Sequence, residues 1–177
     1  MKTENLVSLR VVLASAFEDS GLDTDPGYIV LTDGHGRMIP VLTEASQVKF
    51  VRWALAQSTS KKDDPISKGL TQDTRRIVIR NVENIPLTNT PSQFSTIFGK
   101  KYLCVVENES AEMEQQTTRL TDGIGEALLN SWPIYITNEA MKIAGVSESD
   151  LQQSGFNNQE GLTQWFKKLP PSSCYKA

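Results

Sequence analysis

The sequence contains few of the residues on which zinc clusters, disulfide frameworks and histidine catalysis depend. Its 177 residues include two cysteines and a single histidine. The cysteines lack the spacing of a zinc box and are too few for a disulfide framework, so Cys104, in an apolar run, is expected to be a buried thiol. His35 lies in an Asp-Gly-His-Gly segment typical of a hairpin turn. We expect it to be a solvated turn residue rather than an acid–base catalyst.

Long apolar runs and an excess of positive charge are also absent. No run approaches the ~20 residues needed to span a membrane, and the net charge is -3, which disfavours a broad basic surface for nucleic acid. Near the start of the chain, Glu4 and Arg10 interrupt the apolar residues Leu6, Leu9 and Val11. This pattern is typical of a folded strand rather than a signal peptide. We therefore expect a cytoplasmic protein without a membrane span.

The chain has no phosphate-binding P-loop and no dinucleotide fingerprint. It does contain two stretches that share the same expected order of elements: strand, turn, strand, helix. The first comprises strands at 28–31 and 38–42 and a helix at 47–57, and the second comprises strands at 102–106 and 112–118 and a helix at 122–130. Aligning Gln47 with Asp122 gives the two stretches nearly equal lengths. The pattern predicts an α+β fold built on an internal duplication whose halves pack together.

The most informative segment is residues 119–145. Thr121 is expected to cap a helix, and Asp122 then lies in the first turn, where negative charge is favoured. Gly123 and Gly125 are poor helix formers, costing roughly 1 kcal/mol each relative to Ala. Their presence indicates a close approach of this helix to another element or to a ligand. A short apolar strand and a second short helix are expected to follow.

This segment, RLTDGIGEALLNSWPIYITNEAMKIAG, resembles the end of the bifunctional nuclease family, whose members carry a pattern close to RPSDAIALALRxGxPIYVxxEVLxxAG. The matching positions follow without a gap: Arg119, Thr121, Asp122, Ile124, Ala127, Leu128, Pro133, Ile134, Tyr135, Ile136, Glu139, Ala144 and Gly145. A weaker match begins at the hairpin of residues 33–40. The resemblance implies a mixed β-sheet with flanking helices. It also implies a dimer that cleaves RNA and DNA with low specificity, using Mg²⁺ or Mn²⁺.

The resemblance covers most of residues 1–150, which we take as a bifunctional-nuclease-like domain. Residues 151–177 are expected to form a C-terminal helical extension that packs on the same domain. Within it, Leu162, Trp165 and Phe166 share one apolar face of a helix at 159–169. The tryptophans of the chain, Trp53 among them, are expected to lie in the core or in a dimer contact.

The candidate catalytic residues are Arg119, Asp122 and Glu126. Asp122 and Glu126 are four residues apart on one helical face, where two carboxylates are able to share a cation, and they are the candidate metal ligands. Arg119 precedes the same helix, where a guanidinium and backbone N–H groups are both able to meet a phosphate. Each residue also has an ordinary structural interpretation, as a helix-dipole partner or a solvated surface charge.

The first half of the chain contributes Arg37, Glu44 and Gln47 as candidate substrate-binding residues. At the position of Gln47 the family usually carries Glu, and a carboxamide is a weaker metal ligand that is unable to act as a base. Two hypotheses follow. The chain is a metal-dependent nuclease that acts on nucleic acid, or it is a non-enzymatic dimeric binding module that kept the fold without the chemistry. Gln47 and the acidic net charge favour the second, while Arg119 and Asp122 favour the first.

Overall fold

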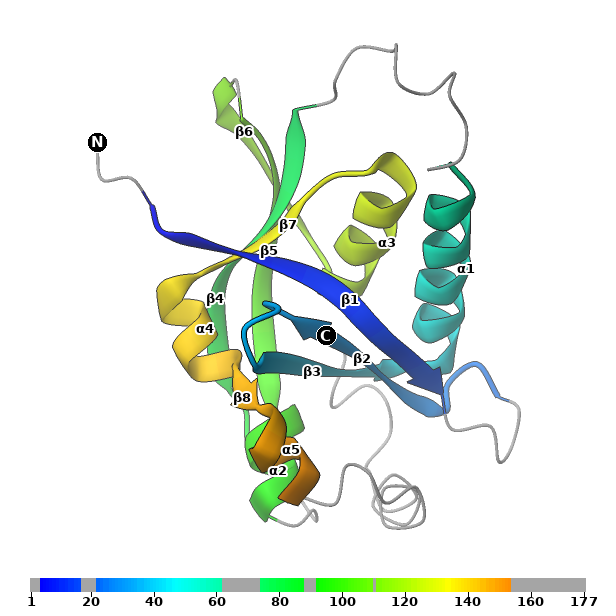
Figure 1. Ribbon diagram of the computed structural model, residues 1–177, viewed down its shortest axis with the longest axis vertical. Coiled ribbons are helices and arrows are strands. Elements are labelled where there is room, and N and C mark those ends of the chain that lie inside the picture. The colour runs from blue at the N-terminus through cyan, green and yellow to red at the C-terminus, as the bar shows by residue number, and fades with distance from the viewer. Residues whose placement is uncertain (1–3, 17–21, 62–73, 88–91, 110, 154–177) are drawn as a thin grey trace.

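The computed structural model describes residues 4–16, 22–61, 74–87, 92–109 and 111–153. These residues form one eight-stranded mixed sheet and five helices (Figure 1). The strands are β1 (Leu6–Ala16), β2 (Pro26–Thr32), β3 (Arg37–Glu44), β4 (Arg75–Asn84), β5 (Lys100–Asn108), β6 (Ala111–Thr118), β7 (Ile134–Thr137) and β8 (Val146–Ser147). The helices are α1 (Ala45–Lys61), α2 (Ser92–Phe98), α3 (Leu120–Asn130), α4 (Asn138–Ala144) and α5 (Glu148–Gln153). The helix expected at 159–169, with Trp165, lies outside the described residues.

The sheet is arranged almost symmetrically about the short strand β7. The strand order is β6-β5-β4-β7-β1-β2-β3-β8, and β7 pairs parallel with β4 and antiparallel with β1. On one side of β7 lies the antiparallel meander β1-β2-β3, followed by α1, and on the other lies β4-β5-β6, followed by α3. The expected strand–turn–strand–helix order is therefore present in both halves, with one further strand preceding each unit. The α+β prediction is confirmed.

The first strand of each half contains a β-bulge. In β1 the register shifts between Val11 and Leu13, and in β4 it shifts between Ile79 and Asn81. A bulge bends its strand and increases the local twist. Residues 6–9 of β1 pair with β7, whereas residues 10–16 pair with β2. The long strand β1 thus links the two halves while the sheet curls around the core.

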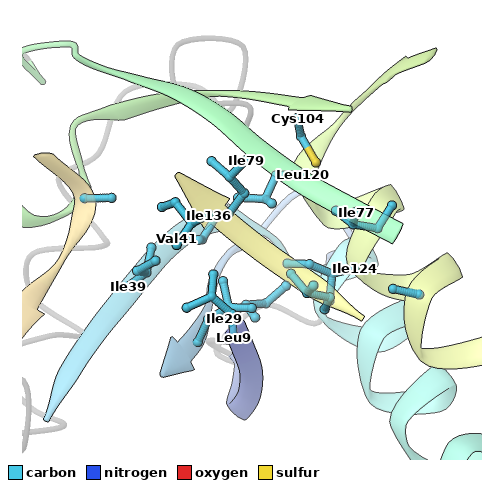
Figure 2. Close-up of a cluster of buried hydrophobic side chains, with 14 of the residues drawn as sticks. Leu9, Ile29, Ile39, Val41, Ile77, Ile79, Cys104, Leu120, Ile124 and Ile136 are labelled. Atoms are coloured by element: carbon cyan, nitrogen blue, oxygen red, sulfur yellow. The ribbon is translucent and has the colours of Figure 1, made fainter. Parts of the chain in front are cut away.

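The main core lies inside this curled sheet and under α1 and α3. Figure 2 shows Ile79 of β4 and Ile136 of the central strand β7 in the same buried cluster as Val41 of β3 and Ile29 of β2. The Tyr102 hydroxyl of β5 donates to the carbonyl of Pro40 in β3 at 3.5 Å, which links the two halves of the sheet. Each of these four apolar side chains is fully buried, and burial of such a side chain contributes roughly 1.5–3 kcal/mol. Packing between the halves is therefore the main support of the fold.

A second apolar cluster covers the outer face of β2 and β3. It is formed by side chains of those strands, of α2 and of α5: Tyr28, Val30, Leu42, Phe94, Ile97, Phe98 and Leu151. Ser147 caps α5 by accepting from the backbone N–H of Asp150 at 3.1 Å, as a capping box requires. No helix among the described residues is long and apolar enough to cross a membrane.

Two expectations about single side chains had different outcomes. Cys104 is fully buried in the main core, as expected, and burial raises the pKa of its thiol to about 12. Trp53 lies outside the core of the chain, because it is 52% exposed on α1, and the alternative expectation of a dimer contact stays a prediction. The helical periodicity placed it on the inward face, but Val51 and Ala54 fill that face and leave Trp53 stacked on Phe50, with ring centroids 6.2 Å apart.

Candidate site at the start of two helices

Helices α1 and α3 run side by side in the same direction, so that their N-terminal ends lie together (Figure 1). Gly125 makes this approach possible, since a Cβ at that position would lie only 2.1 Å from Cε1 of the Phe50 ring. Gly123 has a similar role against the sheet, where a Cβ would lie 3.0 Å from Cγ2 of Thr118. The expectation that both glycines serve close approach is confirmed.

Three of the candidate residues meet where these helices begin. Arg119 Nε donates to Asp122 Oδ2 at 2.8 Å, and Arg119 Nη2 donates to Asp122 Oδ1 at 3.3 Å. Gln47, the third residue of α1, faces Asp122, the third residue of α3. With its amide oriented to satisfy its neighbours, Gln47 donates to Asp122 Oδ1 at 3.1 Å and accepts from Arg119 Nη2 at 3.2 Å. The two halves of the chain therefore share one hydrogen-bonded cluster.

Opposite charges are balanced within this cluster. The hydrogen bond and the charge of Asp122, and more weakly the charge of Glu44, raise the pKa of the Arg119 guanidinium. Glu44 directly precedes α1, and Asp122 lies in the first turn of α3. Two neighbouring helix N-termini repel each other through their partial positive charges, and a carboxylate near each one offsets that repulsion. In this arrangement the guanidinium is paired with Asp122, and the Arg119 side chain stays partly exposed to solvent.

Thr121 has a different role from the expected one. Helix α3 begins at Leu120, its N-cap residue is Arg119, and no side chain of that residue caps the helix. Thr121 lies inside the first turn, is only 1% exposed, and its hydroxyl accepts from the Gln47 amide at 3.1 Å. The prediction of a Thr121 cap was therefore wrong. Sequence propensity favours Thr over Arg as a cap, but here the hydroxyl serves the contact between the helices instead.

Glu126 and Arg37 lie apart from the cluster. Glu126 is exposed on the next turn of α3, and among the described residues no contact joins its carboxylate to Asp122. Arg37 begins β3, whereas Glu44 ends it, and seven residues of strand separate them by roughly 23 Å. The side chain of Arg37 pairs instead with Asp33 at 2.8 Å, within the hairpin that holds the exposed His35. Arg37 therefore belongs to a hairpin, and not to this site.

The carboxylate of Asp122 in the cluster, and that of Glu44, whose charge acts on Arg119, supply oxygens of the kind that Mg²⁺ and Mn²⁺ prefer. Within the part of the chain that the structure describes, no group of three or more His, Cys, Asp or Glu side chains is placed to hold a metal ion. Mg²⁺ is commonly bound through only one or two protein carboxylates together with substrate phosphates and waters. The residues of the cluster thus fit a cation that binds together with a phosphate.

A second charged cluster, which sequence reasoning missed, joins β4 to β5. Glu107 accepts from Arg80 at 2.6 Å and pairs with Arg76 at 3.5 Å, and Arg80 also pairs with Glu4. The Glu107 side chain is 10% exposed, and its two guanidinium partners neutralise it. Through the pair of Glu4 and Arg80, this cluster joins the residues before β1 to β4. The charged residues alternate along β4 and β5, and that alternation does not indicate which of them will pair.

A pocket of about 410 Å³ opens between β4, β5 and β6, near the C-terminal end of α3. Its lining residues are Arg75, Val106, Glu107, Asn108, Gln115 and Gln116. None of the residues around Arg119 and Asp122 lines it. At the candidate site the side chains of Arg119 and Asp122 are 52% and 36% exposed, so both are accessible to a molecule from solvent.

No protein-family model matches the chain, and no curated protein matches it. Membership of the bifunctional nuclease family, which the pattern of residues 119–145 resembles, therefore stays a prediction.

Proposed function

We propose that this chain is a low-specificity nuclease that cleaves RNA and DNA with Mg²⁺ or Mn²⁺ at the Arg119–Asp122–Gln47 cluster. The observation that carries the proposal is the meeting of residues from both halves of the chain. Arg119 and Asp122 come from the best-matching segment, and Gln47 and Glu44 come from the equivalent helix start of the other half. Gln47, Asp122 and Arg119 share hydrogen bonds, and the side chains of Arg119 and Asp122 are exposed enough for a nucleic-acid strand to reach them.

Arg119 would bind the phosphate. In the structure its guanidinium is occupied by Asp122, but the pair is about half exposed. Exposed ion pairs contribute only about 0–1 kcal/mol, so a phosphate group is able to draw the guanidinium away at little cost. A guanidinium binds phosphate through two parallel N–H donors, the same geometry that it shows toward Asp122. The Asp122 carboxylate is then released from its cationic partner.

Asp122 and Glu44 would hold the cation once Arg119 has turned to the phosphate. When bound, a divalent cation polarises the phosphoryl oxygens and lowers the pKa of a bound water. The protein contributes the fixed positions of the two carboxylates and of the guanidinium. Glu126 stays a predicted ligand, and its exposed carboxylate lies one helical turn away from Asp122.

A second candidate function is a non-enzymatic dimeric binding module. Two observations favour it: Gln47 supplies an amide at the place of the expected carboxylate, and Asp122 is already neutralised by Arg119. The net charge of -3 also weakens attraction to a polyanion. For the nuclease and for the binding module alike, we propose that the protein is a cytoplasmic homodimer. Light scattering on the purified chain measures its oligomeric state.

The test of the proposal is a cleavage assay on single-stranded and double-stranded RNA and DNA, with Mg²⁺, Mn²⁺ or EDTA. Cleavage that requires the cation, is lost with EDTA and returns when Mn²⁺ is added in excess supports the nuclease. A chain that cleaves none of the four substrates with either cation supports the binding module. Arg119→Met should raise KM for the polymer, because this residue contacts the phosphate.

A further inference from the structure

Gln47 occupies the centre of the contact between the two helices. Its amide nitrogen lies 3.1 Å from Asp122 Oδ1 and 3.1 Å from Thr121 Oγ1, and its amide oxygen lies 3.2 Å from Arg119 Nη2. One side chain of the first half therefore contacts three side chains of the second half. These are the two residues proposed to bind phosphate and cation, and the buried hydroxyl beside them.

An amide satisfies all three neighbours at once. The Asp122 carboxylate only accepts hydrogen bonds, and the Arg119 guanidinium only donates them. A side chain between them must therefore donate to one and accept from the other, and Gln does both at neutral charge. A glutamate of the same length would accept from Arg119, but it would place a second negative charge beside Asp122 Oδ1. A methionine of the same length would make neither bond.

We propose that Gln47 is the positioning residue of this site: it holds Asp122 and Arg119 in place from the other half of the chain. This inference rests on the proposed function for its effect on cleavage, but not for its effect on the side-chain geometry. When Arg119 leaves Asp122 for a phosphate, the amide still donates to Asp122 Oδ1. The carboxylate then keeps its orientation without its cationic partner.

The positioning role that we propose for Gln47 differs from the role of a metal ligand or of a residue that contacts the substrate. Gln47 is half-buried between the helices, and Arg119 lies on its exposed side. Side chains that orient the groups bound directly to metal or substrate typically change activity or metal affinity by 10–100-fold when they are replaced. The substitution should therefore alter the catalytic rate more than the affinity for the polymer.

The experiment compares Gln47→Met and Gln47→Glu, which keep the size of the side chain, with the matched control Gln57→Met. Gln57 is exposed near the other end of α1. Two quantities are measured: the kinetics of RNA and DNA cleavage with Mn²⁺, and the hydrogen-exchange rate of the Arg119 Nε–H by NMR. Circular dichroism confirms that each variant is folded.

We expect Gln47→Met to lower kcat by about 10- to 100-fold with KM within about twofold. It should also accelerate exchange of the Arg119 Nε–H about fivefold, because the Asp122 carboxylate that accepts from this N–H loses the hydrogen bond that holds it in place. Gln47→Glu should lower kcat as well, and Gln57→Met should change neither quantity. If Gln47→Glu cleaves faster than the natural chain, position 47 serves as a ligand and the positioning role is overturned.

The two readouts separate the inference from the function on which it rests. If the natural chain cleaves no substrate but Gln47→Met still accelerates the exchange, the nuclease proposal fails and the positioning of Arg119 and Asp122 stands. If the exchange rate is the same in Gln47→Met, Gln57→Met and the natural chain, Gln47 does not position the pair, whether or not the chain cleaves nucleic acid.

Discussion

Replacing Gly125 by alanine tests the close packing that brings the two helix starts together. A Cβ at this position would lie 2.1 Å from Cε1, 2.6 Å from Cζ and 2.8 Å from Cδ1 of Phe50. Unstrained carbon atoms are about 3.5–4.0 Å apart, so the ring must retreat by more than about 1 Å. The backbone of α3 would stay in place, since Gly123 and Ile124 are buried against the sheet.

The free-energy change combines two opposing effects. Overpacking typically costs about 1–3 kcal/mol, and alanine stabilises a helix interior by roughly 1 kcal/mol relative to glycine. Gly125→Ala should therefore destabilise the chain by about 1 kcal/mol, which lowers Tm by about 2–4 °C for a domain of this size. With Phe50→Ala in place the overpacking disappears, and the same Gly125→Ala change should become stabilising by up to about 1 kcal/mol.

Urea denaturation of the four proteins in this double-mutant cycle, followed by circular dichroism, measures the coupling. Equal slopes of free energy against urea concentration would show that the denatured state is unchanged. The reasoning fails if Gly125→Ala stabilises the natural chain. It also fails if the cost of Gly125→Ala is the same with and without the Phe50 ring, because the ring would then not be the group that the new methyl meets.

Three further predictions concern stability. Glu107→Gln leaves two partly buried guanidinium groups without their shared carboxylate and should cost about 3 kcal/mol in urea denaturation, whereas Glu83→Gln on an exposed part of β4 should change the free energy by less than about 0.5 kcal/mol. Because burial raises the pKa of Cys104 from 9.0 to about 12, stability should fall as pH rises above about 9, by at most about 1.4 kcal/mol per pH unit from this group. Cys104→Val should remove that part of the slope. Burial alone would raise the pKa of Asp33, but hydrogen bonds from the hairpin lower it below its usual value. Stability should therefore fall as pH drops below about 4, and an acid titration of Asp33→Asn should lack this contribution.

Much of the fold was predictable because the local patterns agree with the packing. The two strand–turn–strand–helix units, the buried Cys104 and the glycines of α3 all follow from periodicity and residue size. The repeat also predicted that the two halves pack together, and the aligned residues Gln47 and Asp122 are in contact in the structure. Here the internal repeat carried long-range information that no single segment contains.

The remaining features depend on contacts between distant segments. In the sequence, Trp53 belongs to a group of apolar residues with helical spacing. Its exposure depends on which neighbouring elements cover that part of α1, and the spacing alone does not report this. The Thr121 hydroxyl was available either to cap α3 or to meet Gln47, and only the approach of α1 decides between these roles. The pairing of Glu107 with Arg80 requires the register of β4 against β5, which the alternating residues alone leave open.

The most direct test of the central claim is the Mn²⁺-dependent rate of RNA cleavage by the natural chain and by Asp122→Asn. Asp150→Asn, the same substitution in the first turn of α5, is the matched control. The account predicts cleavage by the natural chain and by Asp150→Asn, and a loss of at least about 100-fold in Asp122→Asn. Equal cleavage by the folded Asp122→Asn variant and the natural chain would contradict it and would place any activity outside this site.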